Sequence, residues 1–276
     1  MSTLSEIIMS RKSVRTYDGC KLSDADLDRI NEVIAGLSNP FGAEVSFRIL
    51  DAETHGLSSP VIAGEKTYVA AVMKKTDFSE AVYGYLFEDF VLKVWELGFG
   101  TVWIGGTMNR GLFERAAALK DDEIMPCVTP IGRPSEKRSI RETVMRKGVK
   151  ADTRKPLGEL FFTDGFSAPM SPDSAGDLKE AFELTRWAPS AVNKQPWRII
   201  AKDGAYHFFE KRDRPRDGDR TGDLQKIDVG IALRHFTAGA AEAGYTPSVV
   251  FADPGIETPD GTFYVATVTG CRYPGD

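Results

Sequence analysis

The feature that most constrains this chain is a repeat, because the same order of predicted elements occurs twice along it. In the first half, a helix that opens at Ser23-Asp-Ala-Asp-Leu27 precedes a predicted strand at Val45–Leu50. In the second half, a helix that opens at Ser174-Ala-Gly-Asp-Leu178 precedes a predicted strand at Pro196–Ile200. Both openings have the form of a capping box, with Ser at the N-cap and Asp three residues later.

Each half continues with a long apolar helix, a short strand and an apolar run that ends in glycine. The corresponding segments are Leu97–Gly100 at the helix end, Thr101–Ile104 and Ile124–Gly132 in the first half, and Gly230–Tyr245, Ser248–Phe251 and Tyr264–Gly270 in the second. Four pairs in the same order predict an ancient duplication of an α+β unit. The stretch Asp164–Asp173, rich in Gly, Pro and Ser, marks the boundary. We therefore assign the halves to residues 1–165 and 166–276, folded as one compact unit like a covalent homodimer.

Composition narrows the class of protein. With 42% hydrophobic and 27% charged residues, the chain has the content of a globular protein with a sizeable core. A formal net charge of -5 argues against a general nucleic-acid binder. The three cysteines form no CxxC pair and the three histidines have no metal-ligand spacing. No uninterrupted apolar stretch approaches the ~20 residues of a membrane span. We expect a cytoplasmic protein with no metal, nucleic-acid or membrane partner.

The first motif that could carry chemistry is the basic stretch Arg11-Lys-Ser-Val-Arg15, which follows a short apolar helix. Two guanidiniums, an ammonium and a hydroxyl in five residues provide charge-assisted donors suited to a phosphate group. A basic helix end favoured by the helix dipole explains the same pattern. The residues alone leave both interpretations open.

The second motif is the loop Trp187-Ala-Pro-Ser-Ala-Val-Asn-Lys-Gln-Pro-Trp197. Its two prolines stiffen the loop, so that Ser190, Asn193 and Gln195 are presented from a fixed frame. Such hydroxyl and amide groups can bind the carbonyl and N–H groups of a polar ring, although a capped connection between helix and strand has the same form. The first-half counterpart, Ser38–Phe47, lacks the aligned Asn and Gln. This difference favours one working site and one decayed site.

Together the two motifs resemble the nitroreductase family of FMN-dependent oxidoreductases. The stretch Gly98–Gly106 is similar to the family's segment beneath the flavin, and Arg154–Phe162 is similar to its C-terminal extension. Ordinary members carry both motifs close together and form homodimers with two flavins, whereas here the motifs are intact in opposite halves. The chain thus resembles the internally duplicated, single-chain TM nitroreductase branch. This implies a nitroreductase-like α+β fold, with a mixed, mainly antiparallel sheet flanked by helices and duplicated as a monomeric pseudo-dimer.

The resemblance also implies roles for individual residues. Basic and hydroxyl groups of the first motif and of the linker would neutralise the FMN phosphate, and Arg15 would stabilise the anionic reduced flavin. Glycines would allow backbone to approach the ring closely, while the second motif would contact the isoalloxazine, with Gln195 and Trp197 buttressing the loop. The implied FMN-binding residues are Arg11, Lys12, Ser13, Arg15, Trp103, Ile104, Gly105, Gly106, Lys137, Arg138, Pro189, Ser190, Ala191, Asn193 and Gln195.

The function implied by the resemblance is an FMN-dependent NAD(P)H oxidoreductase of nitroreductase type. One FMN would pass reducing equivalents from NAD(P)H to a small electrophilic acceptor such as a nitroaromatic or a quinone. The flavin carries this chemistry, so no catalytic side chain is expected, and the chain lacks a Gly-x-Gly-x-x-Gly dinucleotide motif. Two other hypotheses remain. One is a flavin-binding protein without turnover, acting in storage or redox response, and the other is a scaffold with two decayed sites.

Overall fold

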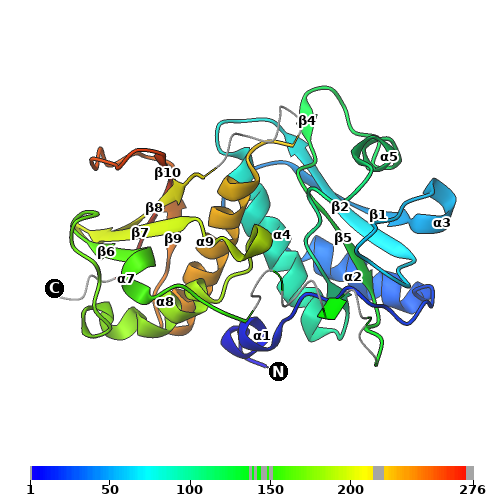
Figure 1. Cartoon of the computed structure of the whole chain (residues 1–276), viewed down its shortest axis with the longest axis horizontal. Helices are drawn as coiled ribbons and strands as arrows, with labels where there is room; N and C mark the ends of the chain where they lie inside the picture. Colours follow the sequence, from blue (N-terminus) through cyan, green and yellow to red (C-terminus); the bar gives the residue numbers. More distant parts are fainter. Residues whose placement is uncertain are drawn as a thin grey trace.

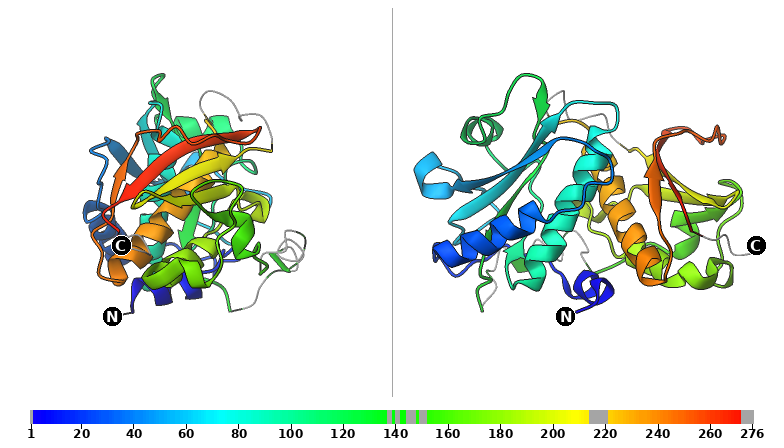
Figure 2. Two further views of the ribbon diagram at one scale, coloured as in Figure 1. Left: turned by 90° about the vertical axis from the view of Figure 1, so that its left-hand side faces the viewer. Right: turned by 180° about the vertical axis from the view of Figure 1, so that it is seen from behind.

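The computed structural model describes residues 2–136, 139, 142–143, 148, 152–213 and 221–271. Two five-stranded sheets lie on either side of two long central helices, α4 and α9 (Figures 1 and 2). The first part of the chain forms α1 (Leu4–Ser10), α2 (Asp24–Ala35), β1 (Val45–Asp51), α3 (Ala52–His55), β2 (Thr67–Lys74), α4 (Ser79–Glu96), β3 (Gly100–Thr101), α5 (Arg110–Ala116), β4 (Glu123–Ile124) and β5 (Val128–Gly132). The second part forms α7 (Leu157–Leu160), β6 (Phe161–Thr163), α8 (Lys179–Arg186), β7 (Trp197–Lys202), β8 (Ala205–Lys211), α9 (Leu224–Glu242), β9 (Ser248–Val250) and β10 (Thr262–Thr269), with short 3₁₀ turns before α8 and β7.

The first sheet has the strand order β1-β2-β5-β3, with β4 also paired to β2, and all of these pairs are antiparallel. Its central strand β2 is buried on both faces, which explains why its sequence is a continuous apolar run. Val69 and Ala71 belong to the main core shared with α4 and α9. The intervening Tyr68 and Ala70 pack in a second core with Phe113 of α5.

The second sheet has the order β6-β7-β8-β10-β9, and among its described pairs only β6 and β7 run parallel. The predicted mixed, mainly antiparallel arrangement flanked by helices is therefore confirmed. Strand β6 belongs to the stretch that precedes residue 165, yet it pairs with the second sheet. The N-terminal helix α1 likewise packs through Ile7 and Ile8 against Leu184 and Ala238 of the second half. The two halves therefore interlock.

Helices α4 and α9 cross at Gly84 and Gly230. A methyl group at Gly84 would collide with the carbonyl of Ile227, and one at Gly230 would collide with the carbonyl of Ala81. Glycine is therefore required at both positions for the two backbones to touch. Because the two contacts are reciprocal, we treat Gly84 and Gly230 as equivalent positions of the two halves. Gly98 and Gly244 then end the two helices at matching places, with φ of 85° and 88°, as is common for glycine at a helix C-terminus.

Some predicted details are wrong, each for a local reason. The capping box at Ser23 is formed, but Ser174 does not cap a helix, because Gly176 (φ 52°, ψ -140°) breaks the chain and α8 begins only at Lys179. The strand predicted over Thr101–Ile104 is reduced to Gly100–Thr101 and one bridge from Ile104 to Val128. The apolar run before Gly132 splits into β4 and β5 around Pro126, which cannot donate to a sheet ladder.

In the described part of the chain, no helix is both long enough and apolar enough to cross a membrane.

Candidate functional site

A cavity of about 650 Å³ lies at the seam between the two halves. Small-molecule and cofactor sites typically enclose roughly 300–1000 Å³, so its size suits such a ligand. We call the part of the interface that contains this cavity the first seam. Twelve of the fifteen predicted site residues line it: Arg11, Lys12, Ser13, Arg15, Trp103, Ile104, Gly105, Gly106, Pro189, Ser190, Ala191 and Asn193. Gln195 is buried beside the cavity and is not among its lining residues. Lys137 and Arg138 lie outside the described residues.

The basic stretch reaches the cavity because α1 ends just before it. Thr3 forms a capping box at the start of α1, and Arg11 leaves the helix with extended backbone angles. The chain then runs along β3, where Val14 N–H donates to Thr101 O at 2.9 Å. A Cβ on Gly100 would lie 2.7 Å from the Val14 side chain, so glycine is needed for this close approach. The stretch is thereby fixed at the cavity wall.

The glycine pair forms another part of the wall. A Cβ on Gly105 would lie 3.1 Å from Leu224 of α9 and 3.2 Å from Cys127 Sγ, whereas one on Gly106 would meet nothing within 4 Å. Arg110 holds this segment by donating to Gly105 O at 2.8 Å and to Pro126 O at 2.9 Å. The segment is therefore rigid and without side chains at two successive positions.

The loop between α8 and β7 is conformationally strained. Val192, Asn193 and Gln195 have φ values of 45°, 57° and 51°, in the left-handed region that non-glycine residues rarely adopt. Ser190 Oγ accepts from Gln195 N–H at 2.9 Å, which closes the loop. The N–H of Ala191 donates to the Asp228 carboxylate on α9 at 3.0 Å. Strain of ~1–3 kcal/mol per residue of this kind is characteristic of functional sites.

The same loop contacts the start of the stretch that resembles the family's C-terminal extension. Asn193 Nδ2 donates to Thr153 O at 3.0 Å, and Lys155 N–H donates to Gln195 Oε1 at 2.9 Å. Gln195 thus connects the loop to the extension. The residue between these two contacts, Arg154, is brought to the cavity wall. Sequence reasoning assigned it no role, although it lies in the quoted extension.

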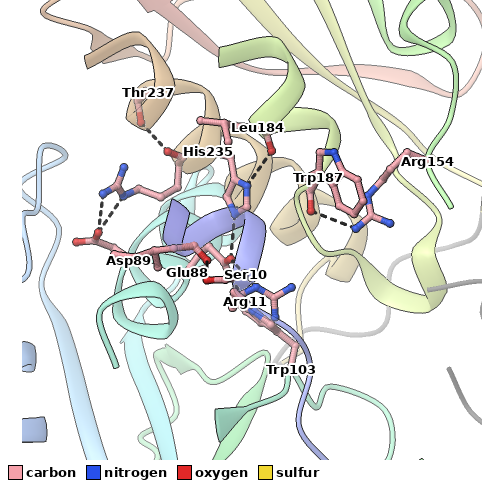
Figure 3. Close-up of polar contacts among 12 residues, drawn as sticks. Ser10, Arg11, Glu88, Asp89, Trp103, Arg154, Leu184, Trp187, His235 and Thr237 are labelled. Carbon is pink, nitrogen blue, oxygen red and sulfur yellow. Dashed lines mark hydrogen bonds and ion pairs between the residues drawn. The ribbon is translucent and has the colours of Figure 1, made fainter. Parts of the chain in front are cut away.

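Arg154 adds a third guanidinium to the cavity lining, besides those of Arg11 and Arg15. It lies over the Trp187 ring at 4.5 Å and donates to Trp187 O at 3.3 Å (Figure 3). Burial, followed by the positive charges of Arg11 and Arg186, lowers the pKa of Arg154 to about 10, so it remains charged at neutral pH. An anion bound in the cavity would relieve the repulsion between these cations. The arrangement is suited to a phosphate group.

With this geometry established, the comparisons with known proteins identify the family. A family model described as "Putative TM nitroreductase" matches residues 3–240. The chain belongs to this family. The resemblance inferred from the motifs is therefore confirmed.

Three individual proteins are similar to this chain to different extents. A crystal structure from Thermotoga maritima, described as "a putative nitroreductase", covers 98% of this chain and 94% of that chain at 21% identity with a TM-score of 0.61, and so shares its fold. The Mycobacterium tuberculosis protein "Putative NAD(P)H nitroreductase acg" is 38% identical over 73 residues, 26% of this chain and 22% of that protein, so the match spans about a fifth of the relative's length. The match to an "FMN-dependent Nitroreductase" of Clostridium difficile R20291 covers 48% of this chain and 88% of that chain, at 16% identity with a TM-score of 0.41.

A buried polar cluster behind the first seam of the nitroreductase escaped sequence reasoning. Glu88 of α4 is fully buried and accepts from Trp103 Nε1–H at 2.9 Å. His235 Nε2 of α9 lies 3.0 Å from the same carboxylate, and Arg11 Nε lies 3.9 Å from it (Figure 3). The available signal was the pair Glu88-Asp89 within the apolar helix, since buried carboxylates require partners from other elements.

The corresponding second seam of the nitroreductase contains aromatic side chains, which we call the aromatic plug: Phe41, Phe78, Tyr85 and Phe251. Phe41 lies 5.1 Å from Tyr85 and 5.7 Å from Phe251, and Phe78 stacks on Phe251 at 4.2 Å between ring centroids. When Gly84 is superposed on Gly230, Phe78 and Tyr85 occupy the positions that the cavity-lining Leu224 and Ile231 occupy in the first seam. In the alignment of the two loops, Phe41 is the residue equivalent to Ala191. Phe251 follows β9 as Trp103–Gly106 follow β3.

Proposed function

We propose that this nitroreductase is an FMN-dependent NAD(P)H oxidoreductase with one cofactor site, in the first seam. The observation that carries this proposal is the convergence of cations, paired glycines and a strained polar loop on one cavity. FMN, when bound there, supplies two-electron transfer between a reduced nicotinamide and a small electrophile such as a nitroaromatic or a quinone. The protein supplies binding, orientation and charge.

The residues of one part of the cavity fit a phosphate group. Arg11, Lys12 and Ser13 offer charged and hydroxyl donors, and Arg154 adds a planar guanidinium. We therefore propose Arg154 as a further phosphate ligand. The linker residues Lys137 and Arg138 stay as predicted candidates.

The remaining lining fits a flat polar ring. Arg15 would place positive charge beside the ring and favour its anionic reduced form. The segment Trp103–Gly106 presents backbone rather than side chains at its two glycines, which allows close approach of a ring. Pro189, Ser190, Ala191 and Asn193 would contact the ring from the second half, on a loop that the extension holds in place.

We propose the same limits of the halves, residues 1–165 and 166–276, as products of a duplication. A single chain that satisfies the homodimer interface internally is proposed to work as a monomer. The described cysteines, Cys20, Cys127 and Cys271, are free thiols, which supports a cytoplasmic location.

Anaerobic reduction tests the proposed function. The flavin-loaded protein is mixed without oxygen with NADH or NADPH, and the visible flavin absorbance is followed, with free FMN at the same concentration as the control. We expect rapid bleaching of the bound flavin, and recovery of the absorbance when a nitroaromatic or quinone is added. Flavin that binds but stays oxidised would instead identify a storage or redox-responsive protein. A protein that binds no flavin would support the scaffold hypothesis instead.

A further inference from the structure

The loop between α8 and β7 contains a residue type that its backbone conformation disfavours. Val192 has a φ of 45° and a ψ of 30°, and a β-branched residue in this left-handed region is a genuine outlier. Val192 is also 64% exposed, so burial contributes little to holding it there. Because strain of this kind persists only where the surroundings fix the backbone, contacts of the neighbouring residues must hold the loop.

The aligned loop of the first half makes the same turn without strain. Gly42 is the residue equivalent to Val192, and its φ of 61° lies in the same left-handed region, which glycine adopts without steric cost. The N–H of the preceding residue, Phe41, donates to Asn39 Oδ1 at 3.3 Å. The first-half loop is therefore closed by one of its own side chains.

The second-half loop is instead fastened to α9. The N–H of Ala191, the equivalent of Phe41, donates to the Asp228 carboxylate, with distances of 3.0 and 3.2 Å to its two oxygens. Asp228 is 5% exposed, and its neighbours Ile227 and Val229 on α9 belong to the main core. Burying a carboxylate is costly unless it is hydrogen-bonded. The contact with the loop therefore stabilises both the carboxylate and the Ala191 amide.

The equivalent position on α4 has no carboxylate. When Gly84 is superposed on Gly230, Asp228 falls on Val82, which is 3% exposed and belongs to the main core. The packing of the helix at this point is thus compatible with an apolar side chain. The carboxylate occurs in the half whose loop is strained and lines the cavity, whereas the half whose loop turns at a glycine has valine there.

We propose that Asp228 is a positioning residue for the cofactor site, which accepts the Ala191 N–H and thereby holds Val192 in its left-handed conformation at the cavity wall. The hydrogen bond from Asn193 to Thr153 anchors the loop on the other side of Val192. Because the loop is held in this shape before a ligand binds, binding does not have to supply the free energy of ordering it. The inference rests on the proposed function, since the ligand is taken to be FMN.

Limited trypsin digestion of the flavin-free full-length protein tests the loop directly, with cleavage after the exposed Lys194 quantified by mass spectrometry. Asp228→Val copies the first-half residue and removes the acceptor, so we expect this cleavage to become about tenfold faster than in wild type. Asp228→Asn keeps an acceptor oxygen and should stay within about threefold of wild type. Cleavage after Lys179, which is exposed on α8, is the internal control and should change in neither variant.

Titration with FMN then connects the loop to the cofactor. We expect Asp228→Val to bind FMN about tenfold more weakly than wild type, and Asp228→Asn to stay within about threefold. In the double variant Asp228→Val/Val192→Gly, glycine adopts the left-handed conformation without strain, so the affinity should return to within about threefold of wild type. Val82→Ala, a core change at the equivalent position of α4, is the matched control and should bind FMN normally.

Three results would overturn this inference. They are wild-type cleavage and affinity in Asp228→Val, equal losses in Asp228→Val and Asp228→Asn, and a double variant that binds FMN as weakly as Asp228→Val alone. In each case, a wild-type protein whose bound FMN is reduced by NAD(P)H leaves the proposed function standing. If the wild type binds no FMN, the proposed function fails, and the digestion after Lys194 still decides whether Asp228 holds the loop.

Discussion

The first seam encloses a cavity of about 650 Å³, whereas the corresponding second seam is occupied by the four aromatic side chains of the plug. Both seams adjoin the crossing of α4 and α9, where each half contributes one glycine, Gly84 or Gly230. In a homodimer every substitution appears at both seams, but in a duplicated chain each seam can change alone. Under the duplication that we propose, one site was kept while the other was filled by packing side chains.

The two buried ion pairs beside the crossing differ in the same sense. Next to the plug, Arg234 and Lys93 both form direct salt bridges with Asp89. Next to the cavity, Glu88 lies 3.0 Å from His235 Nε2 and 3.9 Å from Arg11 Nε. The looser arrangement lies on the side where a cation faces a cavity.

The largest expected effect comes from copying the plug into the first seam. Ala191→Phe gives this loop the residue that its counterpart carries at Phe41, and the new ring would occupy the proposed ring site. We expect FMN affinity to fall more than ~100-fold, because a packed aromatic ring and a bound flavin cannot share the space. Equilibrium titration measures it, with Phe41→Ala as the control that should bind FMN normally. Normal binding by Ala191→Phe would break the comparison.

Removing a cation from the first seam should have the next largest effect. Arg15→Ala removes one charged donor from the cavity wall. A hydrogen bond to a charged group contributes about 1.5–3 kcal/mol, so we expect FMN affinity to fall roughly 10- to 100-fold. Lys179→Ala, which removes the same charge from an exposed position on α8, is the control for titration. Equal losses in both variants would show that only net charge matters.

Removing one ring of the aromatic plug should lower the stability of the fold without changing FMN affinity. Phe41 is half-buried and contacts two rings. Phe41→Ala should therefore lower the free energy of unfolding by about 1–3 kcal/mol. Urea denaturation measures this change, and FMN affinity should stay within twofold of wild type. A fall in FMN affinity comparable to that of Arg15→Ala would mean that the second seam also takes part in binding.

The smallest effects are expected at aligned loop positions that differ between the halves. Asn193→Ala removes the hydrogen bond to Thr153 that holds the extension, and FMN affinity should fall severalfold as Arg154 becomes less well placed. Ala43→Ser, at the aligned position of the first half, should change neither stability by more than ~0.5 kcal/mol nor affinity. Similar losses from the two substitutions, measured by the same titration, would contradict a single site.

Local patterns predicted the fold well where the signal was itself local. The capping box at Ser23 formed because nothing nearby interrupts its helix, while the one at Ser174 failed because Gly176 breaks the chain two residues later. The cavity lining was predicted for residues in recognised motifs. Arg154 was not, since its place depends on hydrogen bonds between the extension and a distant loop.

Contacts between helices that are distant along the chain also could not be predicted from local sequence patterns. His235 shows no metal-ligand spacing along the chain, and its contact with Glu88 follows only from the packing of α9 against α4. The aromatic plug brings together residues from both halves that are separated by most of the chain. Its members look like ordinary core residues until the two seams are superposed.

The flavin content of the purified protein tests the central claim most directly. Acid release of the bound flavin, quantified against protein concentration after saturation with FMN, gives the number of cofactors per chain. The account predicts one FMN per chain, bound at the first seam and lost in Ala191→Phe. Two FMN per chain would contradict the filled second seam, and none would contradict the proposed cofactor site.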